Sequence, residues 1–373
     1  MANKDKRQMI FRRFADQLNL LKANGFLPGI TLQHDLTYIC PMCLRQFSMA
    51  DLETGAPNML TLEHAPPESV GGKGVALTCK QCNSIAGHEV DFHLGERLRE
   101  IESRSFLPNT SMQVRATNNG LTVQATVHVQ ADGTMKMTHS ETNNHLAKIE
   151  AFADAVDPVT NPAVQLEYRK TKTTFRGFEM GLLKTAYILA FAKYGYSFIL
   201  DGVYDVVRAQ LRQPEFDLYP QHFWLSDLPE FRQHQGVLFC TTPIAECLLS
   251  VFHLSPSERA YYYGVCLPIP LSNLELSCRT LYNMRHGGAV DFSKPNPGID
   301  CLFDLEEIKA NHRWFRDIRW SKITLNSTQN VPTAMNYLRH PIRKGEIKQS
   351  RKSNRIKTGA VILAHACSPC PDP

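Results

Sequence analysis

Four cysteines in the first quarter of the chain have the spacing of metal ligands. They form two C-x2-C pairs, Cys40 with Cys43 and Cys79 with Cys82. A two-residue gap lets a tight turn point both sulfurs of a pair at one ion, and four thiolates complete a tetrahedral zinc site with no open position. The spacing therefore predicts a structural zinc ion. The alternative is two chance pairs of buried cysteines.

Side chains suited to phosphodiester hydrolysis lie between these pairs and just after them, namely Glu63, His64, Asn83 and His88. Hydrolysis needs a base that deprotonates water and a cation that neutralises charge on the leaving oxygen. An imidazole suits the first task at neutral pH, and a carboxylate with an amide oxygen suits Mg²⁺ or Mn²⁺. Because adjacent strand residues point to opposite faces, Glu63 and His64 need a twist or a bulge to serve one centre.

The combined pattern C-x2-C, EH-x-x-P, GG, C-x2-C-N resembles the HNH endonuclease family, with its ββα-metal core and zinc staple, over residues 38–91. The resemblance implies that His64 is the general base and that Glu63 and Asn83 hold a catalytic Mg²⁺ or Mn²⁺ ion. It implies that His88 adds to the metal shell or touches phosphate. Hydrolysis would then leave a 3′-hydroxyl and a 5′-phosphate.

Two positions depart from the family pattern. The family usually has Asp where Glu63 stands, and the longer side chain is expected to shift the metal or its preference. The family also has Asn where this chain has Gly74, which is expected to reduce the rigidity of the loop. Zinc-stapled folds also bind nucleic acid or protein without cutting, so a non-catalytic adaptor is the alternative function.

The elements expected to position these residues give an α+β fold class. A basic amphipathic helix over 4–24 ends at Asn24-Gly25, and a charged helix over about 90–104 follows the second cysteine pair. We therefore expect a zinc-stapled, treble-clef-like ββα-metal domain over residues 1–104. The predicted remainder is a larger mixed α+β domain over 105–338 and a basic, weakly structured tail over 339–373.

The expected second domain begins with alternating apolar residues. Segments 112–117, 121–129 and 135–140 are separated by Asn-Gly and Asp-Gly, which predicts a three-stranded meander. A helix is expected over 144–156, and the segment around 178–198 is apolar on nearly all sides, as in a buried helix. The later segments VLFCTT, AECLLSVFHL and RAYYYGVCLPIPL indicate strands of a further sheet. A role in specificity, sensing or oligomerisation is left open for this domain.

The net charge of +5 is modest, but the tail is locally basic, with eight Lys or Arg and one Glu over 339–357. We expect this tail either to bind phosphates without base readout or to be a solvated segment. A nucleic-acid partner is expected, DNA more than RNA, and restriction or defence against foreign DNA is an analogy from architecture. The basic residues expected to contact phosphates are Arg343, Lys344, Lys348, Arg351 and Lys352.

The expected compartment is the cytoplasm, because the N-terminus lacks the apolar core of a signal peptide. The most apolar segment contains Lys184 and Lys193, whose charges make a membrane span costly, so no membrane partner is expected. In a reducing compartment the paired cysteines are more often metal ligands than disulfides. We assign Lys184 no role, take Cys367 and Cys370 as tail thiols, and leave a homo-oligomer open.

Overall fold

The structure is a computed structural model of the 373-residue chain. It describes residues 3–139, 141–156, 164–168, 172–242, 245–257, 259–270, 272–283, 292–293 and 299–312. The tail 339–373, with its five expected phosphate-binding residues and its two cysteines, lies outside the described residues.

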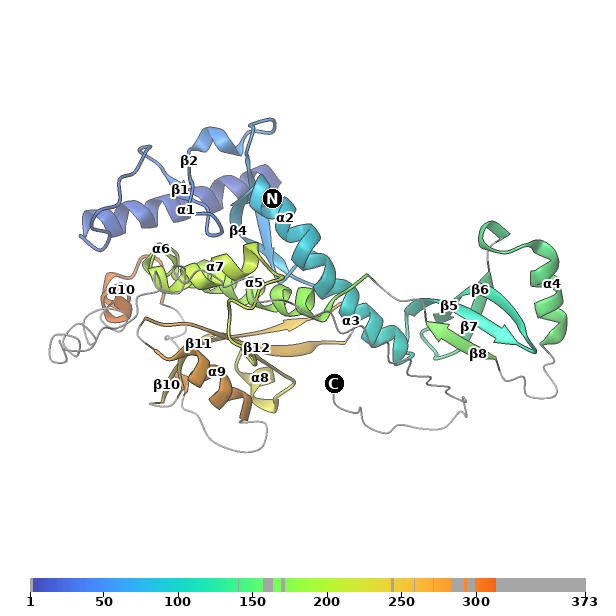
Figure 1. The fold of residues 1–373 in the computed structure, drawn as a ribbon. Coiled ribbons are helices and arrows are strands. Elements are labelled where there is room, and N and C mark those ends of the chain that lie inside the picture. Colours follow the sequence, from blue (N-terminus) through green and yellow to red (C-terminus); the bar gives the residue numbers. More distant parts are fainter. Residues whose placement is uncertain are drawn as a thin grey trace, which may run out of the picture. The chain divides into compact units, whose positions relative to one another are not determined.

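The chain divides into two compact units, and the division differs from the expected one (Figure 1). The first unit combines Met1–Leu98 with the described residues from Thr173 onward, and the second contains Arg99–Lys172. The expected boundary at 104/105 therefore lies close to the end of the first segment. The expectation of one domain over 105–338 is wrong, because its C-terminal part shares a hydrophobic core with the N-terminal segment.

The N-terminal segment begins with the expected helix, α1 (Asn3–Ala23), whose apolar side is buried at Phe11, Phe14 and Leu18. Gly25, at φ +74°, follows the helix end, as a left-handed C-terminal cap requires. Two antiparallel hairpins and a helical segment come next. Their elements are β1 (Tyr38–Ile39), β2 (Gln46–Phe47), β3 (Leu60–Ala65), β4 (Lys73–Cys79), α2 (Lys80–Ala86), the π-helical η3 (Gly87–Asp91) and α3 (Phe92–Arg104), with the 3-10 turns η1 (Met49–Leu52) and η2 (Glu68–Val70) between them.

The expected buried helix is α5 (Phe175–Tyr194), which lies at the centre of the first unit. It contacts β3, β4 and η3 on one side and strands β10, β11 and β12 of a sheet on the other. Two glycines let its N-terminal half approach α3 closely. A Cβ at Gly177 would lie 2.4 Å from the His93 ring, and one at Gly181 would lie 2.7 Å from Leu94.

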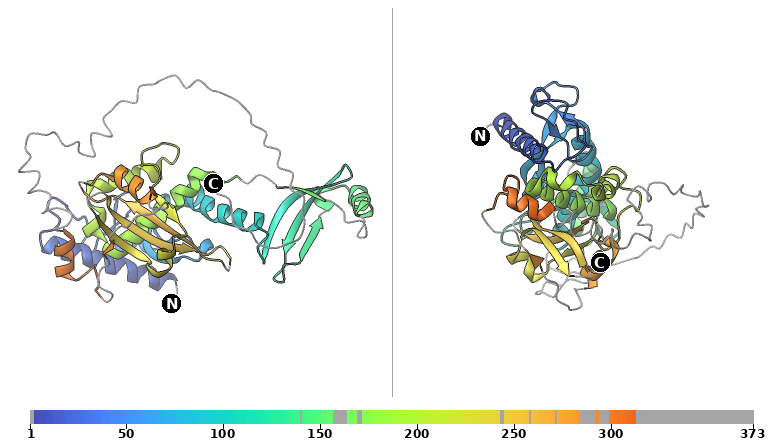
Figure 2. Two further views of the ribbon diagram at one scale, coloured as in Figure 1. Left: turned by 90° about the horizontal axis from the view of Figure 1, so that it is seen from below. Right: turned by 90° about the vertical axis from the view of Figure 1, so that its left-hand side faces the viewer.

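The sheet that packs against α5 is antiparallel, with strand order β13-β10-β11-β12-β9, and it contains the three strands expected from the late apolar segments (Figure 2). Its strands are β9 (Trp224–Ser226), β10 (Gly236–Thr242), β11 (Ala245–Leu254), β12 (Tyr261–Leu267) and β13 (Phe292–Ser293). The helices around it are α6 (Tyr196–Ile199), α7 (Asp205–Arg212), α8 (Pro229–Gln233), α9 (Leu274–Asn283) and α10 (Leu305–His312), with the 3-10 turn η5 (Gly202–Tyr204).

The second unit has a sheet and a hydrophobic core of its own. Its sheet order is β7-β6-β5-β8, so the predicted meander is confirmed and a fourth strand is added. Asn119, Gly120 and Gly133 have positive φ in its turns, which the Asn-Gly and Asp-Gly dipeptides predicted. The elements are β5 (Thr110–Asn118), β6 (Leu121–Val129), β7 (Met135–His139), the 3-10 turn η4 (Glu141–Asn143), α4 (Leu146–Ala155) and β8 (Gln165–Tyr168).

Over the described residues, none of the helices combines the length and the apolar character that crossing a membrane requires. The apolar helix α5 instead serves as the centre of a folded core, in which Lys184 is buried and Lys193 is half-buried.

Candidate metal centre and hydrolytic site

The four predicted cysteines come together as one cluster. The Sγ atoms of Cys40, Cys43, Cys79 and Cys82 all lie within 4.8 Å of one another. The Sγ atoms of Cys43 and Cys79 are 3.8 Å apart. A tetrahedral zinc ion with Zn–S bonds of about 2.3 Å has its sulfurs about 3.8 Å apart. The cluster therefore fits a structural zinc ion, and no fifth position is left for water or substrate.

Local backbone geometry points these sulfurs at one another. Cys40 follows β1, and a tight turn closes with the Leu44 N–H donating to the Cys40 carbonyl at 2.9 Å. Leu44 takes φ +59°, the left-handed conformation that brings the chain back into β2. Cys79 ends β4 and Cys82 lies in the first turn of α2. The cluster thus joins the first hairpin, the end of the second hairpin and the start of the helix.

Mutual hydrogen bonds shift the pKa values of these thiols. The hydrogen bond with Cys40 lowers the pKa of Cys43 to about 7. Hydrogen bonds with the other thiols, that of Cys40 first, also lower the pKa of Cys79. The hydrogen bond with Cys43 raises the pKa of Cys40. Since the thiolate is the metal ligand, zinc would replace protons that the cluster otherwise shares.

The β3–β4 hairpin contains a bulge opposite Glu63 and His64, but it does not bring the two side chains to one centre. Glu63 pairs with Ala76 and His64 with Gly74, so Val75 is the extra residue on β4. The two neighbouring side chains have different environments. The Glu63 side chain is 2% exposed, whereas that of His64 is 28% exposed. His64 Nε2 lies 3.8 Å from the Glu68 carboxylate. The His64 imidazole is thus accessible to solvent, whereas the carboxylate of Glu63, the preceding residue, is not.

Glu63 faces a lysine from the central helix. Its Oε1 lies 2.7 Å from Lys184 Nζ, and its Oε2 accepts a hydrogen bond from Thr78 Oγ1 at 2.8 Å. Lys184 Nζ also lies 2.6 Å from Asp91 Oδ2. We call Glu63, Lys184 and Asp91 the carboxylate–lysine triad. Lys184 and Glu63 are buried and Asp91 is partly exposed, and two carboxylates with one ammonium leave the triad with one surplus negative charge.

Asp91 has one carboxylate oxygen that makes no contact in the triad. Its Oδ1 is buried and has no hydrogen-bond partner. Burial raises the pKa of Asp91 to about 6; Lys184 lowers it and Glu63 raises it further. Burial lowers the pKa of Lys184, but the carboxylates of Glu63 and Asp91 offset this and leave its pKa above the ordinary value. The lysine is therefore charged in the core because two carboxylates face it.

The other two expected site residues lie on the helical segment after the last cysteine. Asn83, on α2, donates from Nδ2 to Thr61 Oγ1 on β3 at 2.9 Å and so fastens the helix to the hairpin. His88, in η3, is exposed. Among the described residues the four cysteines are the one group of three or more His, Cys, Asp or Glu ligands close enough to share an ion. Glu63, His64 and His88 are thus not assembled as a three-ligand metal shell.

The backbone conformation favours glycine at position 71, and close neighbours require glycine at positions 72 and 74. Gly71 takes φ +86° at the end of η2. A Cβ at Gly72 would lie 1.5 Å from the Pro66 carbonyl oxygen, so only glycine fits where the turn returns to β4. At Gly74, where the family has Asn, a Cβ would lie 2.5 Å from the Leu62 side chain. The close packing of Leu62 therefore requires glycine at this position.

Sequence reasoning did not find Lys184, which it left without a role, or Asp91. One signal was available. A lysine in the middle of an otherwise apolar helix has to meet opposite charge when the helix is buried. The identity of the partners could not follow from that signal, because they lie in a segment far away in the sequence.

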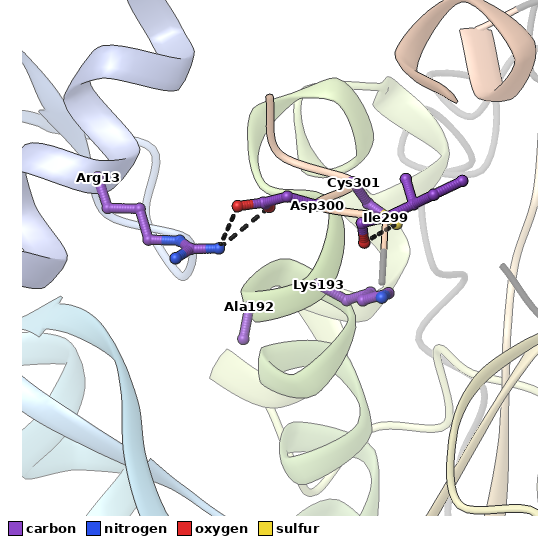
Figure 3. Close-up of a pocket in the computed structure, with 6 residues that line it drawn as sticks. All are labelled: Arg13, Ala192, Lys193, Ile299, Asp300 and Cys301. Atoms are coloured by element: carbon purple, nitrogen blue, oxygen red, sulfur yellow. Dashed lines mark hydrogen bonds and ion pairs between the residues drawn. The ribbon is translucent and has the colours of Figure 1, made fainter. Parts of the chain in front are cut away.

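A separate cavity of about 300 Å³ lies between α1, α5 and residues 299–301 (Figure 3). Arg13 and Asp300, which both line it, form an ion pair at 2.9 Å, and both side chains are about half exposed. None of the residues that line it belongs to the cysteine cluster or to the carboxylate–lysine triad. We therefore do not assign it to the candidate hydrolytic site.

In chemical terms, the arrangement offers an accessible imidazole on a hairpin that a closed four-cysteine cluster can fasten to a helix. No protein-family model, curated protein or solved structure matches this chain.

Proposed function

We propose that this chain is an HNH-type endonuclease that hydrolyses phosphodiester bonds, in DNA more than in RNA. The observation that supports it most is the environment of His64. This imidazole lies at a bulge in the hairpin that enters α2, it is partly exposed, and it follows a buried carboxylate. The strand–strand–helix order around it agrees with the ββα core that the sequence pattern implied.

In this proposal His64 accepts the proton of the attacking water. A neutral imidazole is the side chain best suited to that role near pH 7. The nearby Glu68 carboxylate, 3.8 Å from Nε2, can stabilise the imidazolium that results. The four cysteines with zinc hold β3, β4 and α2 together and take no part in the bond cleavage. A role in restriction or defence against foreign DNA belongs to the proposal by analogy.

The proposed Mg²⁺ or Mn²⁺ ion does not fit the described arrangement of its expected ligands. Both oxygens of Glu63 already have protein partners, Lys184 and Thr78. The Nδ2 group of Asn83 donates to Thr61 Oγ1, which orients the amide but does not use the oxygen that would bind an ion, so the misfit lies at Glu63. An ion at Glu63 would have to replace the lysine or share an oxygen with it. We therefore assign no step of the reaction to a divalent ion.

The ion pair between Glu63 and Lys184 also allows a second candidate function. A non-catalytic zinc-containing module that binds nucleic acid or protein needs no divalent ion at Glu63, and the pairing of Glu63 with Lys184 is compatible with such a module. Such a module would keep the cysteine cluster, because that cluster stabilises the fold whether or not bonds are cut. It would show binding without product.

One assay separates the two candidates. Purified full-length protein is incubated with supercoiled plasmid, short single- and double-stranded DNA and RNA, with Mg²⁺, Mn²⁺ or EDTA. His64→Ala tests the base, and His34→Ala is a matched control, because His34 is an exposed histidine of the same segment. Cleavage that is lost in His64→Ala and kept in His34→Ala supports the nuclease. A gel shift with unchanged nucleic acid in every condition supports the adaptor.

A further inference from the structure

The carboxylate–lysine triad lies where the family pattern implies a metal ion. Glu63 directly precedes His64, and the family pattern implies that this acidic residue holds the ion. In the structure a positive charge is present at that carboxylate, but it is the ammonium of Lys184, at 2.7 Å. The same ammonium is 2.6 Å from Asp91, so it bridges two carboxylates as a bound cation would.

Lys184 is buried, and its ammonium is held by two carboxylates. Its side chain is 2% exposed and comes from α5, the helix at the centre of the first unit. Burying an ammonium is costly unless opposite charges and hydrogen bonds compensate for lost water. Glu63 and Asp91 supply that compensation from β3 and from η3. The lysine and the two carboxylates therefore require one another.

We propose that the Lys184 ammonium occupies the cation position between Glu63 and Asp91 and excludes divalent ions from it. Lys184 is then a positioning residue: it holds the Glu63 carboxylate beside the bulge and leaves His64 on the exposed side of β3. The inference depends on the proposed function only in taking Glu63 as the family's metal position. It also explains the misfit of the expected Mg²⁺ or Mn²⁺ ion.

Removal of the ammonium should convert the triad into a divalent-cation site. Glu63 and Asp91 would then face one another without a counter-ion, and Asp91 Oδ1 is already a buried acceptor without a partner. In the wild type, their oxygens already share one cation, the ammonium, at 2.7 and 2.6 Å, and carboxylate oxygens are ligands that Mn²⁺ accepts. A merely structural lysine would give loss of stability on substitution and no new affinity for an ion.

The test is Mn²⁺ binding to the zinc-loaded protein, measured by the electron paramagnetic resonance signal of free Mn²⁺. The variants are Lys184→Met, Lys184→Arg and Glu63→Gln, with Lys193→Met as the control on the same helix. We expect Lys184→Met to bind Mn²⁺ about tenfold more tightly than the wild type or better. Lys184→Arg and Lys193→Met should bind as the wild type does, and adding Glu63→Gln to Lys184→Met should remove the gain.

Two outcomes would overturn the proposal. One is an unchanged Mn²⁺ affinity in folded, zinc-containing Lys184→Met. The other is a tenfold weaker affinity in Glu63→Gln alone, which would show that Glu63 already binds the ion with Lys184 present. The second measurement stands even if Lys184→Met does not fold. Because binding is measured and not cleavage, a wild type that cuts nothing refutes the proposed function and leaves this result interpretable.

Discussion

Replacement of Cys79 by serine tests the structural role assigned to the cysteine cluster. Cys79 is buried at the end of β4, and its sulfur is 3.8 Å from that of Cys43. A closed zinc site contributes roughly 10–16 kcal/mol of apparent folding free energy. That is as large as the whole stability of a typical domain, about 5–15 kcal/mol. Loss of zinc should therefore unfold the β3–β4 hairpin and α2.

The unfolding is expected to spread beyond the hairpins. Tyr38, next to the first cysteine pair, packs on Phe11, Phe14 and Phe191, which belong to α1 and α5. We expect the zinc content to fall from one ion per chain toward zero, together with the near-ultraviolet circular dichroism of these rings. Elemental analysis after dialysis and thermal unfolding measure the two effects.

Cys278→Ser is the control for the cost of burying a hydroxyl. Cys278 is also buried, on α9, and lies outside the cluster. Its substitution should cost about 1–3 kcal/mol and leave the zinc content unchanged. A wild-type protein without zinc, or Cys79→Ser with a full zinc complement and an unchanged melting temperature, would refute the reasoning.

Two further predictions concern the residues around the hairpin. The folded pKa of Asp91, about 6, lies above its ordinary value of 3.8, so its protonated form stabilises the fold below about pH 4, and this stability is lost as pH rises through 6. The free energy of unfolding should fall by up to about 3 kcal/mol over this pH range in the wild type and should not show this fall in Asp91→Asn. If denaturant unfolding gave the same dependence on pH in both proteins, the prediction would be contradicted. Gly72→Ala should destabilise by more than about 2 kcal/mol, because its Cβ would lie 1.5 Å from the Pro66 carbonyl oxygen. Gly87→Ala, with no atom within 4 Å of its Cβ, should be neutral or slightly stabilising in the same denaturant unfolding, and equal losses in both variants would argue against the steric reason.

Local patterns predicted much of the fold. The C-x2-C spacing predicted the cysteine cluster, because two residues are enough to close the turn that brings both sulfurs together. The Asn119-Gly120 and Asp132-Gly133 dipeptides predicted the turns of the meander, because these residue types adopt the positive φ that tight turns need. A bulge is present beside His64, but its extra residue is on β4, and Glu63 and His64 do not face the one centre for which a bulge was expected.

Long-range contacts could not be predicted in the same way. The partner of Glu63 is Lys184, which reaches it only after α5 has packed against the β3–β4 hairpin. The division of the chain also depends on that packing, since residues 99–172 separate two segments that share one core. A charged residue that is buried requires a partner of opposite charge, but a single sequence does not identify that partner.

The central claim is that the imidazole of His64 is the base of a hydrolytic reaction, and the most direct test is a single-turnover cleavage rate. Wild type and His64→Ala, at equal zinc content, are mixed in excess with a fluorescently labelled DNA duplex. Loss of a general base is predicted to slow cleavage by about 100-fold or more, without loss of zinc. Equal rates in the two proteins, or no cleavage by the wild type in Mg²⁺, Mn²⁺ or EDTA, would contradict the claim.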